Sequence, residues 1–115
     1  MGQEMAVSLD KFWQHAAPGR PLRVVLGDRW LSGNVSFYGA THPIAFFTDG
    51  IFLHDPEKLR HYGALLILAA GEQPDQWLRR LSFLRVANHE SLHLRRAGHR
   101  LNLQAWVLLP QPVGG

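Results

Sequence analysis

The sequence predicts an α/β domain with three layers, in which helices cover both faces of a mostly parallel, Rossmann-like sheet. Short apolar runs that are typical of buried strands occur at 22–26, 44–47 and 64–70. Segments with helical spacing or helix-start signals lie between these runs. Strands that alternate with helices favour parallel pairing through right-handed crossovers. A final stretch of alternating apolar and polar residues adds a C-terminal antiparallel β-hairpin.

Two helices flank the first predicted strand. Ser8 is typical of a helix N-cap, and the apolar residues that follow it recur at helical spacing: Leu9, Phe12, Trp13 and Ala16. Pro18-Gly19 is expected to end this helix. The strand at 22–26 breaks at Gly27-Asp28, where a second helix over 29–38 begins. One face of that helix carries Leu31, Asn34, Val35 and Tyr38, and Gly39 is expected to end it in the left-handed conformation.

The middle of the chain predicts two more strand–helix units. The strand at 44–47 is expected to close at Thr48-Asp49-Gly50, and Asp55-Pro56-Glu57 has the cap, the proline and the acid of a helix start. Gly63 is expected to end that helix. The run 64–70 is apolar on both faces, as in the centre of a covered sheet. Pro74-Asp75 begins a further helix, whose inward residues are Trp77, Leu78, Leu81 and Leu84.

The C-terminal part alternates with a period of two. Leu92 and Leu94 alternate with polar residues, and so do the apolar residues of a second run: Leu101, Leu103, Ala105, Val107 and Leu109. The loop between them, 96–100, has the size of a hairpin turn. Three of the four Trp residues fall on inward helical faces and are expected in the core: Trp13, Trp30 and Trp77. Trp106 lies on a strand face that is either a docking surface or the underside of a packed helix.

Length and composition predict a single folded domain over residues 1–115. Hydrophobic residues make up 46% and charged residues 18%, which is enough to bury a core without disulfide or metal staples. The absence of Cys excludes a disulfide framework, a thiolate zinc site and a cysteine nucleophile. The longest apolar run has seven residues, and no basic segment followed by an apolar stretch begins the chain. The chain itself is therefore expected to be soluble, without a signal peptide.

The net charge of +3 is unevenly distributed along the chain. Residues 60–115 contain seven Arg and three acidic residues, and six of these Arg lie between positions 79 and 100: Arg79, Arg80, Arg85, Arg95, Arg96 and Arg100. Such an Arg79–Arg100 patch is either a solvated surface or an anion-binding module that holds phosphate groups. No aromatic RNA-binding motif accompanies the arginines, so a nucleic-acid partner is not expected.

The motif His89-Glu90-Ser91-Leu92-His93 matches HExxH. On a helix, this spacing places two imidazoles one turn apart to bind zinc, with the Glu as general base. His99 follows at the spacing of a third ligand, so a small zinc hydrolase that uses His89, Glu90, His93 and His99 is one alternative. However, the period of two around this motif favours a strand, on which the spacing is a coincidence.

Gly27-Asp28-Arg29 lies where the first predicted strand ends. Ligands of open α/β sheets gather at the carboxyl ends of strands, although Asp28 is equally suited to cap its own helix. No GxGxxG, GxxxxGK[ST] or GxSxG motif occurs in the chain. No cofactor and no hydrolase nucleophile are therefore expected.

The segment 20–38, RPLRVVLGDRWLSGNVSFY, resembles the soluble C-terminal region of bacterial membrane glycosyltransferases of family 39, which are related to dolichyl-phosphate-mannose protein mannosyltransferases. Those regions have the form RPL-x-VVGDRWLAGN-x-x-x-Y, followed by a Pro-led strand (here 42–47), an acidic-start helix (55–62) and a Gly-led strand (63–68). They close on an AxxxPP strand, which 105–110 partly matches: Pro110 is followed by Gln111, so the double proline is missing.

This resemblance implies that the chain is the non-catalytic periplasmic domain of a larger membrane protein. Such enzymes transfer a sugar from a polyprenyl-phosphate donor to a protein or lipid acceptor, and their catalytic carboxylate lies in a loop between membrane helices. The partners implied are the membrane-embedded domain of the same parent protein and the donor or acceptor. Four residues of the matching block are the candidates for ligand contact: Gly27, Asp28, Arg29 and Asn34.

Overall fold

The computed structural model describes residues 2–39, 41, 43–47, 56–96 and 98–112. Its helices and strands follow one another along the chain in the order α1 (Gly2–Ala16), β1 (Val24–Gly27), α2 (Arg29–Tyr38), β2 (Ile44–Phe47), α4 (Pro56–Tyr62), β3 (Ala64–Ala69), α5 (Asp75–Arg80), β4 (Leu84–Arg96) and β5 (His99–Pro110). The expected turn at 48–50 and the expected cap at Asp55 lie outside the described residues.

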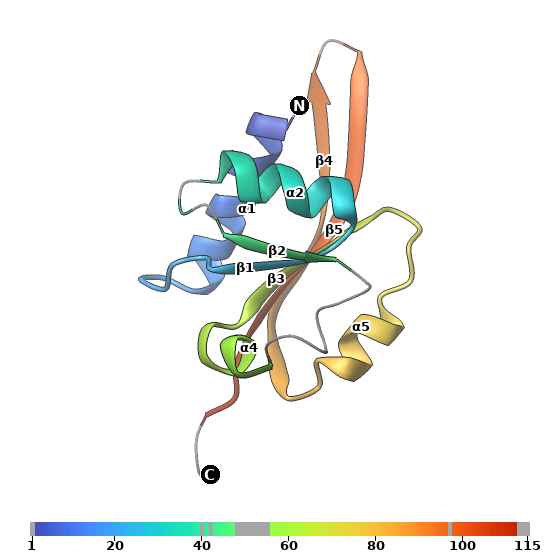
Figure 1. The fold of residues 1–115 in the computed structure, drawn as a ribbon. Coiled ribbons are helices and arrows are strands. Elements are labelled where there is room, and N and C mark those ends of the chain that lie inside the picture. The colour runs from blue at the N-terminus through green and yellow to red at the C-terminus, as the bar shows by residue number, and fades with distance from the viewer. Residues whose placement is uncertain (1, 40, 42, 48–55, 97, 113–115) are drawn as a thin grey trace.

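The strands form one mixed sheet in the order β2-β1-β3-β5-β4 (Figure 1). β1 pairs with β2 and with β3 in parallel, and the latter register places Gly27 beside Ile67. β5 pairs with both β3 and β4 in the antiparallel direction. β3 is therefore the strand at which the parallel part of the sheet meets the antiparallel hairpin.

The expectation of a mostly parallel, Rossmann-like three-layer fold is wrong. β4 and β5 have 13 and 12 residues, whereas the parallel strands β1 and β2 have four each. The long antiparallel hairpin therefore contributes most of the sheet. The physical reason lies in the segment after α5, where Leu84 begins β4 instead of ending a helix. That segment pairs with the end of β5, and this pairing makes the antiparallel hairpin longer than the sequence predicts.

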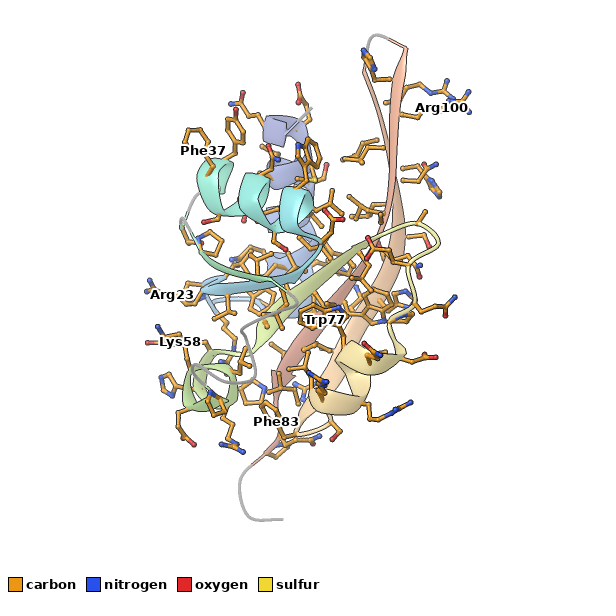
Figure 2. All side chains as sticks on the ribbon, turned by 45° about the vertical axis from the view of Figure 1, so that its right-hand side comes forward. Arg23, Phe37, Lys58, Trp77, Phe83 and Arg100 are labelled. Atoms are coloured by element: carbon orange, nitrogen blue, oxygen red, sulfur yellow. The ribbon has the colours of Figure 1, made fainter. Side chains whose placement is uncertain are left out.

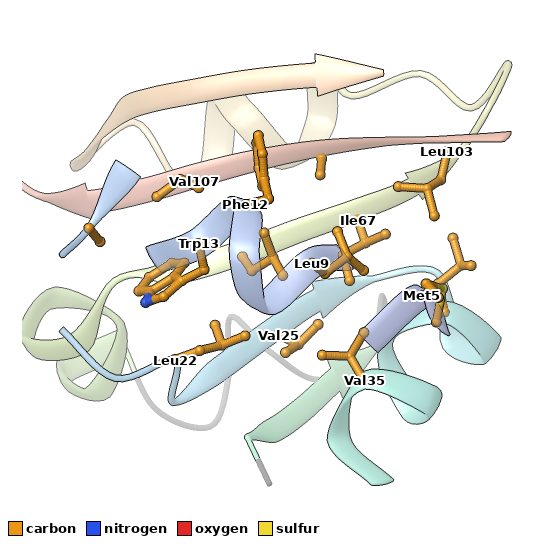
Figure 3. Close-up of a cluster of buried hydrophobic side chains, with 14 of the residues drawn as sticks. Met5, Leu9, Phe12, Trp13, Leu22, Val25, Val35, Ile67, Leu103 and Val107 are labelled. Carbon is orange, nitrogen blue, oxygen red and sulfur yellow. The ribbon is translucent and has the colours of Figure 1, made fainter. Parts of the chain in front are cut away.

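Two hydrophobic clusters fill the two faces of the sheet, because alternate residues of each strand point to opposite faces. Figure 3 shows the cluster beneath α1 and α2, which includes Met5, Leu9, Phe12, Trp13, Val25, Val35, Ile67, Leu103 and Val107. The other face carries a second cluster. It combines residues of β3 and β5 with residues of the α4 and α5 region: Leu59, Leu66, Leu68, Trp77, Leu81, Trp106 and Leu108. Trp106 is buried in this cluster, so its strand face lies beneath packed helices and is not a docking surface.

Several helix boundaries differ from those expected. α1 begins at Gly2 rather than after Ser8, because the buried residues Met5 and Ala6 extend its apolar stripe toward the N-terminus. Gly39 has a φ of −66°, so the expected left-handed end of α2 is wrong, whereas Gly63 ends α4 with a φ of +72° as expected. Among the described residues, no helix combines the length and the apolar character that crossing a bilayer requires.

Trp30 and Tyr38 of α2 are not core residues. Trp13 and Trp77 are buried as expected, but 52% of Trp30 and 47% of Tyr38 are exposed. The side of α2 that packs on the sheet carries Leu31 and Val35 instead. The helical spacing identified the inward face correctly for two residues, but that face is narrower than the sequence suggests.

Replacement of Gly27 tests the junction between β1 and α2. Gly27 has a φ of +118°, and a Cβ there would overlap the backbone carbonyl oxygen of Ile67. We expect Gly27→Ala to lower the free energy of unfolding by more than about 2 kcal/mol, because strain and backbone overlap add. Urea denaturation measures this loss.

Gly33→Ala is the matched control, since nothing lies within 4 Å of a Cβ at this helical position. The expected change is a gain of roughly 0.5–1 kcal/mol from the better helix propensity of Ala. Equal effects of the two substitutions would contradict the assigned role of Gly27.

Candidate functional site

Gly27 and Asp28 lie at the carboxyl edge of the parallel strands. Gly27 pairs with Phe47 of β2 on one side and with Ile67 of β3 on the other. The N–H of Asp28 donates to the carbonyl of Ile67 over 2.9 Å. Oδ1 of Asp28 accepts a hydrogen bond of 3.0 Å from the N–H of Leu31, so Asp28 is the N-cap of α2. These contacts join the sheet to the helix.

The other two candidate ligand residues lie along α2. Arg29 begins the helix, and its side chain is outside the described part of the structure. Nδ2 of Asn34 donates to the carbonyl of Trp30 over 2.8 Å. Asn34 lies six residues after Asp28, which is about 9 Å along the helix axis. The structure therefore brings Gly27 and Asp28 together but does not bring Asn34 to the same edge.

Asn34 also has a packing role between the two N-terminal helices. A Cβ at Gly2 would overlap Oδ1 of Asn34 and would lie 3.0 Å from Cε2 of Tyr38. The first turn of α1 can therefore approach the last turns of α2 because residue 2 has no side chain. The contact places the beginning of α1 beside the end of α2 (Figure 1).

The HExxH motif lies on β4, not on a helix. His89 and His93 share one face of the strand, about 13 Å apart, and Glu90 lies on the opposite face. His99 pairs with Arg96 at the far end of the hairpin. A single zinc ion cannot contact residues spread in this way, and the described residues contain no group of three or more His, Cys, Asp or Glu that could hold a metal.

Both histidines have partners across the hairpin. The ring of His89 stacks on the indole of Trp106, with centroids 4.4 Å apart and planes inclined by 3°. Nδ1 of His93 forms a hydrogen bond of 2.8 Å with Oδ1 of Asn102. These cross-strand contacts explain why a strand accommodates the motif without any metal chemistry.

The arginines at 79–100 do not form one surface. Arg79 and Arg80 lie on α5, and Arg85 pairs with Leu109 near the beginning of β4. Arg95 pairs with Arg100 near the tip of the hairpin. Ten residues of strand, roughly 30 Å, separate Arg85 from Arg95. The arginines of the alternative anion-binding module are therefore divided between two ends of the molecule.

A basic hollow that the sequence motifs do not indicate lies at the amino ends of the parallel strands. Its volume is about 690 Å³, and its polar and basic lining includes Arg20, Arg23, Arg60, His61 and Tyr62. Nη1 of Arg20 donates to the carbonyl of His61 over 3.2 Å, and Nε1 of Trp13 donates to the carbonyl of Arg20 over 2.7 Å. Several cationic side chains around one hollow provide the chemistry that a phosphate or carboxylate group needs.

A signal for this hollow is present in the sequence. Arg23 directly precedes β1, and His61 lies three residues before β3. Because β1 and β3 are parallel neighbours, the residues before them meet at one edge of the sheet. The candidates that the sequence suggests, Gly27 and Asp28, lie at the opposite, carboxyl edge.

Zinc addition tests the interpretation of the HExxH motif. We expect one equivalent of zinc to leave the melting temperature and the imidazole resonances of His89 and His93 unchanged, because no zinc ion can bridge the two rings. Nuclear magnetic resonance titration and a thermal melt measure the two quantities. A saturable shift of both imidazoles at one equivalent, together with a raised Tm, would contradict the strand geometry.

Comparisons with known proteins add no relative: no family model, no curated protein and no solved structure matches this chain.

Proposed function

We propose that this chain is the non-catalytic periplasmic domain of a membrane glycosyltransferase that transfers a sugar from a polyprenyl-phosphate donor to a protein or lipid acceptor. Its partner is the membrane-embedded domain of the same parent protein. The observation that carries the proposal is the resemblance of the block from Gly27 to Asn34, in which three residues have a defined structural role. Gly27 permits the contact with β3, Asp28 caps α2, and Asn34 lies between α2 and α1.

The order of the other matching segments supports the same proposal. Pro43 precedes β2, Gly63 precedes β3, and β5 ends at Pro110. The matching segments thus correspond to successive elements of one fold, and the residues that carry the resemblance specify where these elements begin or end. This supports a shared architecture with the soluble region of the family.

Antibodies against the purified 115-residue chain test the proposal. In cells that encode this sequence, we expect them to detect an antigen well above 13.0 kDa, the mass of the chain itself. This antigen should stay in the membrane pellet after extraction with alkaline carbonate, because a protein with membrane helices resists this treatment. A 13 kDa antigen that carbonate releases, or that occurs only in the soluble fraction, would contradict a membrane-embedded parent.

The basic hollow favours anion binding as a second function of the domain. The side chains of Arg23 and His61 are exposed at the hollow, and the bond from Arg20 to the carbonyl of His61 joins its two sides. Arg60 contributes less, since its Nη1 pairs with Glu57 at 2.7 Å and its guanidinium lies 5.0 Å from the ring centroid of Phe83. The groups available for a phosphate ligand are therefore mainly those of Arg20, Arg23 and His61.

Pyrophosphate serves as the probe for this hollow. We expect Arg23→Glu to weaken its binding by about tenfold or more, because a charge-assisted hydrogen bond is lost and a repulsive charge is introduced. Isothermal titration calorimetry measures the affinity. The control is Arg79→Glu, which changes the net charge equally on the exposed side of α5. Equal weakening by both variants, or no binding to the unaltered chain, would exclude the hollow as the site.

A further inference from the structure

The outer face of α2 exposes large aromatic side chains. Trp30, Phe37 and Tyr38 are 52%, 71% and 47% exposed. Trp30 and Phe37 are seven residues apart, so they share one side of the helix. Phe37 and Tyr38 pack edge to face, with ring centroids 4.8 Å apart and an angle of 81° between their planes. Figure 2 shows Phe37 pointing away from the body of the domain.

These exposures are unusual for a helix whose inner face is already buried. Leu31 and Val35 provide the contacts with the core, and a surface helix in contact with water normally carries polar residues on its other side. A cluster of large apolar side chains at the surface is typical of a site of interaction. The ring of Tyr38 also lies close to Gly2 of α1, but the folding of the domain does not explain the exposure of Trp30 and Phe37.

The tip of the β4–β5 hairpin has a second unusual feature. Arg95 lies directly opposite Arg100, and like charges in such cross-strand pairs repel each other. These two arginines share a hollow of about 290 Å³ with His93, Leu94 and Asn102. His93 is held in place by its bond to Asn102. An anion between the two guanidinium groups would relieve their repulsion and form charge-assisted hydrogen bonds with them.

Both features lie at the same end of the molecule. The hairpin tip and α2 occupy the upper part of Figure 1, and the labelled Phe37 and Arg100 stay there after the 45° turn of Figure 2. α5 and the beginning of β4 lie toward the opposite end. Figure 2 shows Phe37 and Arg100 on opposite sides of this end, so a partner that contacts both has to extend across the whole end.

We propose that this end, formed by Trp30, Phe37, Tyr38, Arg95 and Arg100, binds an anionic lipid surface. Trp and Tyr rings are favoured at the level of lipid headgroups, and arginines bind the phosphates there. A bilayer provides many phosphates in one plane, which suits cations and rings on two separate elements. The proposal concerns the isolated chain and does not depend on the glycosyltransferase assignment.

Sedimentation with lipid vesicles tests the proposal. The purified chain is expected to bind vesicles that contain phosphatidylglycerol and to bind phosphatidylcholine vesicles only weakly. The double variant Arg95→Glu, Arg100→Glu should lose about tenfold or more in vesicle affinity, because each basic residue near an anionic surface contributes substantially to binding. The matched control is Arg79→Glu, Arg85→Glu, which changes the net charge equally at the other end and should retain most of the affinity.

The aromatic contribution has its own matched pair. Phe37→Ser should weaken vesicle binding, whereas Val86→Ser, at a residue that is 53% exposed on β4 away from the tip, should not. Circular dichroism confirms that each variant is folded.

Tryptophan fluorescence gives a second readout. Trp30 is the exposed indole, whereas Trp13, Trp77 and Trp106 are at most 7% exposed. Vesicles with phosphatidylglycerol should shift the emission to shorter wavelength, and Trp30→Phe should abolish the shift.

Three outcomes would overturn the proposal. The first is the absence of binding to anionic vesicles by the unaltered chain. The second is equal loss of affinity in the two charge-reversed variants, which would show that net charge alone attracts the chain. The third is a shift in fluorescence that persists in Trp30→Phe. None of these outcomes changes the carbonate-extraction result for the parent protein, so the two proposals fail separately.

Discussion

The whole fold depends on the pairing of β3 with its two different neighbours. β3 is parallel to β1 and antiparallel to β5, and residues Ala64–Leu68 are buried on both faces. Leu65 and Ile67 belong to the cluster beneath α1 and α2, while Leu66 and Leu68 belong to the opposite cluster. A polar residue in this strand would therefore disturb one core or the other. The close approach of β1 at Gly27, the cap of α2 and the attachment of the hairpin all follow from this central position.

The sequence predicts those features whose signals are local. The two-sided apolar run of β3, the cap at Asp28, the stop at Gly63 and the alternation of the hairpin strands need only nearest neighbours along the chain. Whether neighbouring strands run parallel or antiparallel is not a local property. Leu81 and Leu84 fit a helical spacing, yet Leu84 begins a strand because β5 offers it a partner. Tertiary pairing decided between two local possibilities, and the mixed sheet is the result.

The candidate sites, like the fold, depend partly on local sequence and partly on tertiary pairing. The HExxH letters imply zinc chemistry only on a helix, and the stacking of His89 on Trp106 reflects a strand instead. The basic hollow could not be recognised from spacing alone, since Arg23 and His61 are 38 positions apart in the sequence. Only the parallel register of β1 and β3 brings the segments before these strands to one edge. Helical spacing predicts Trp30 in the core because it gives the direction of the buried face and not its width, whereas 52% of Trp30 is exposed.

Residues whose contacts stabilise the fold are explained by folding, whereas residues that destabilise it are candidates for a function. Gly27, Asp28 and Asn34 each have a contact that the folded chain needs, so their presence requires no ligand. Among the described residues, Arg95 lies opposite the like charge of Arg100, and the ring of Phe37 is 71% exposed although it packs against Tyr38. Local costs without an internal gain are expected at functional surfaces, because folding alone would not favour them. The proposed lipid-binding surface therefore consists of other residues than the block that carries the resemblance. These residues lie on the outer face of α2 and at the tip of the hairpin, where an anionic surface would offset the repulsion between Arg95 and Arg100.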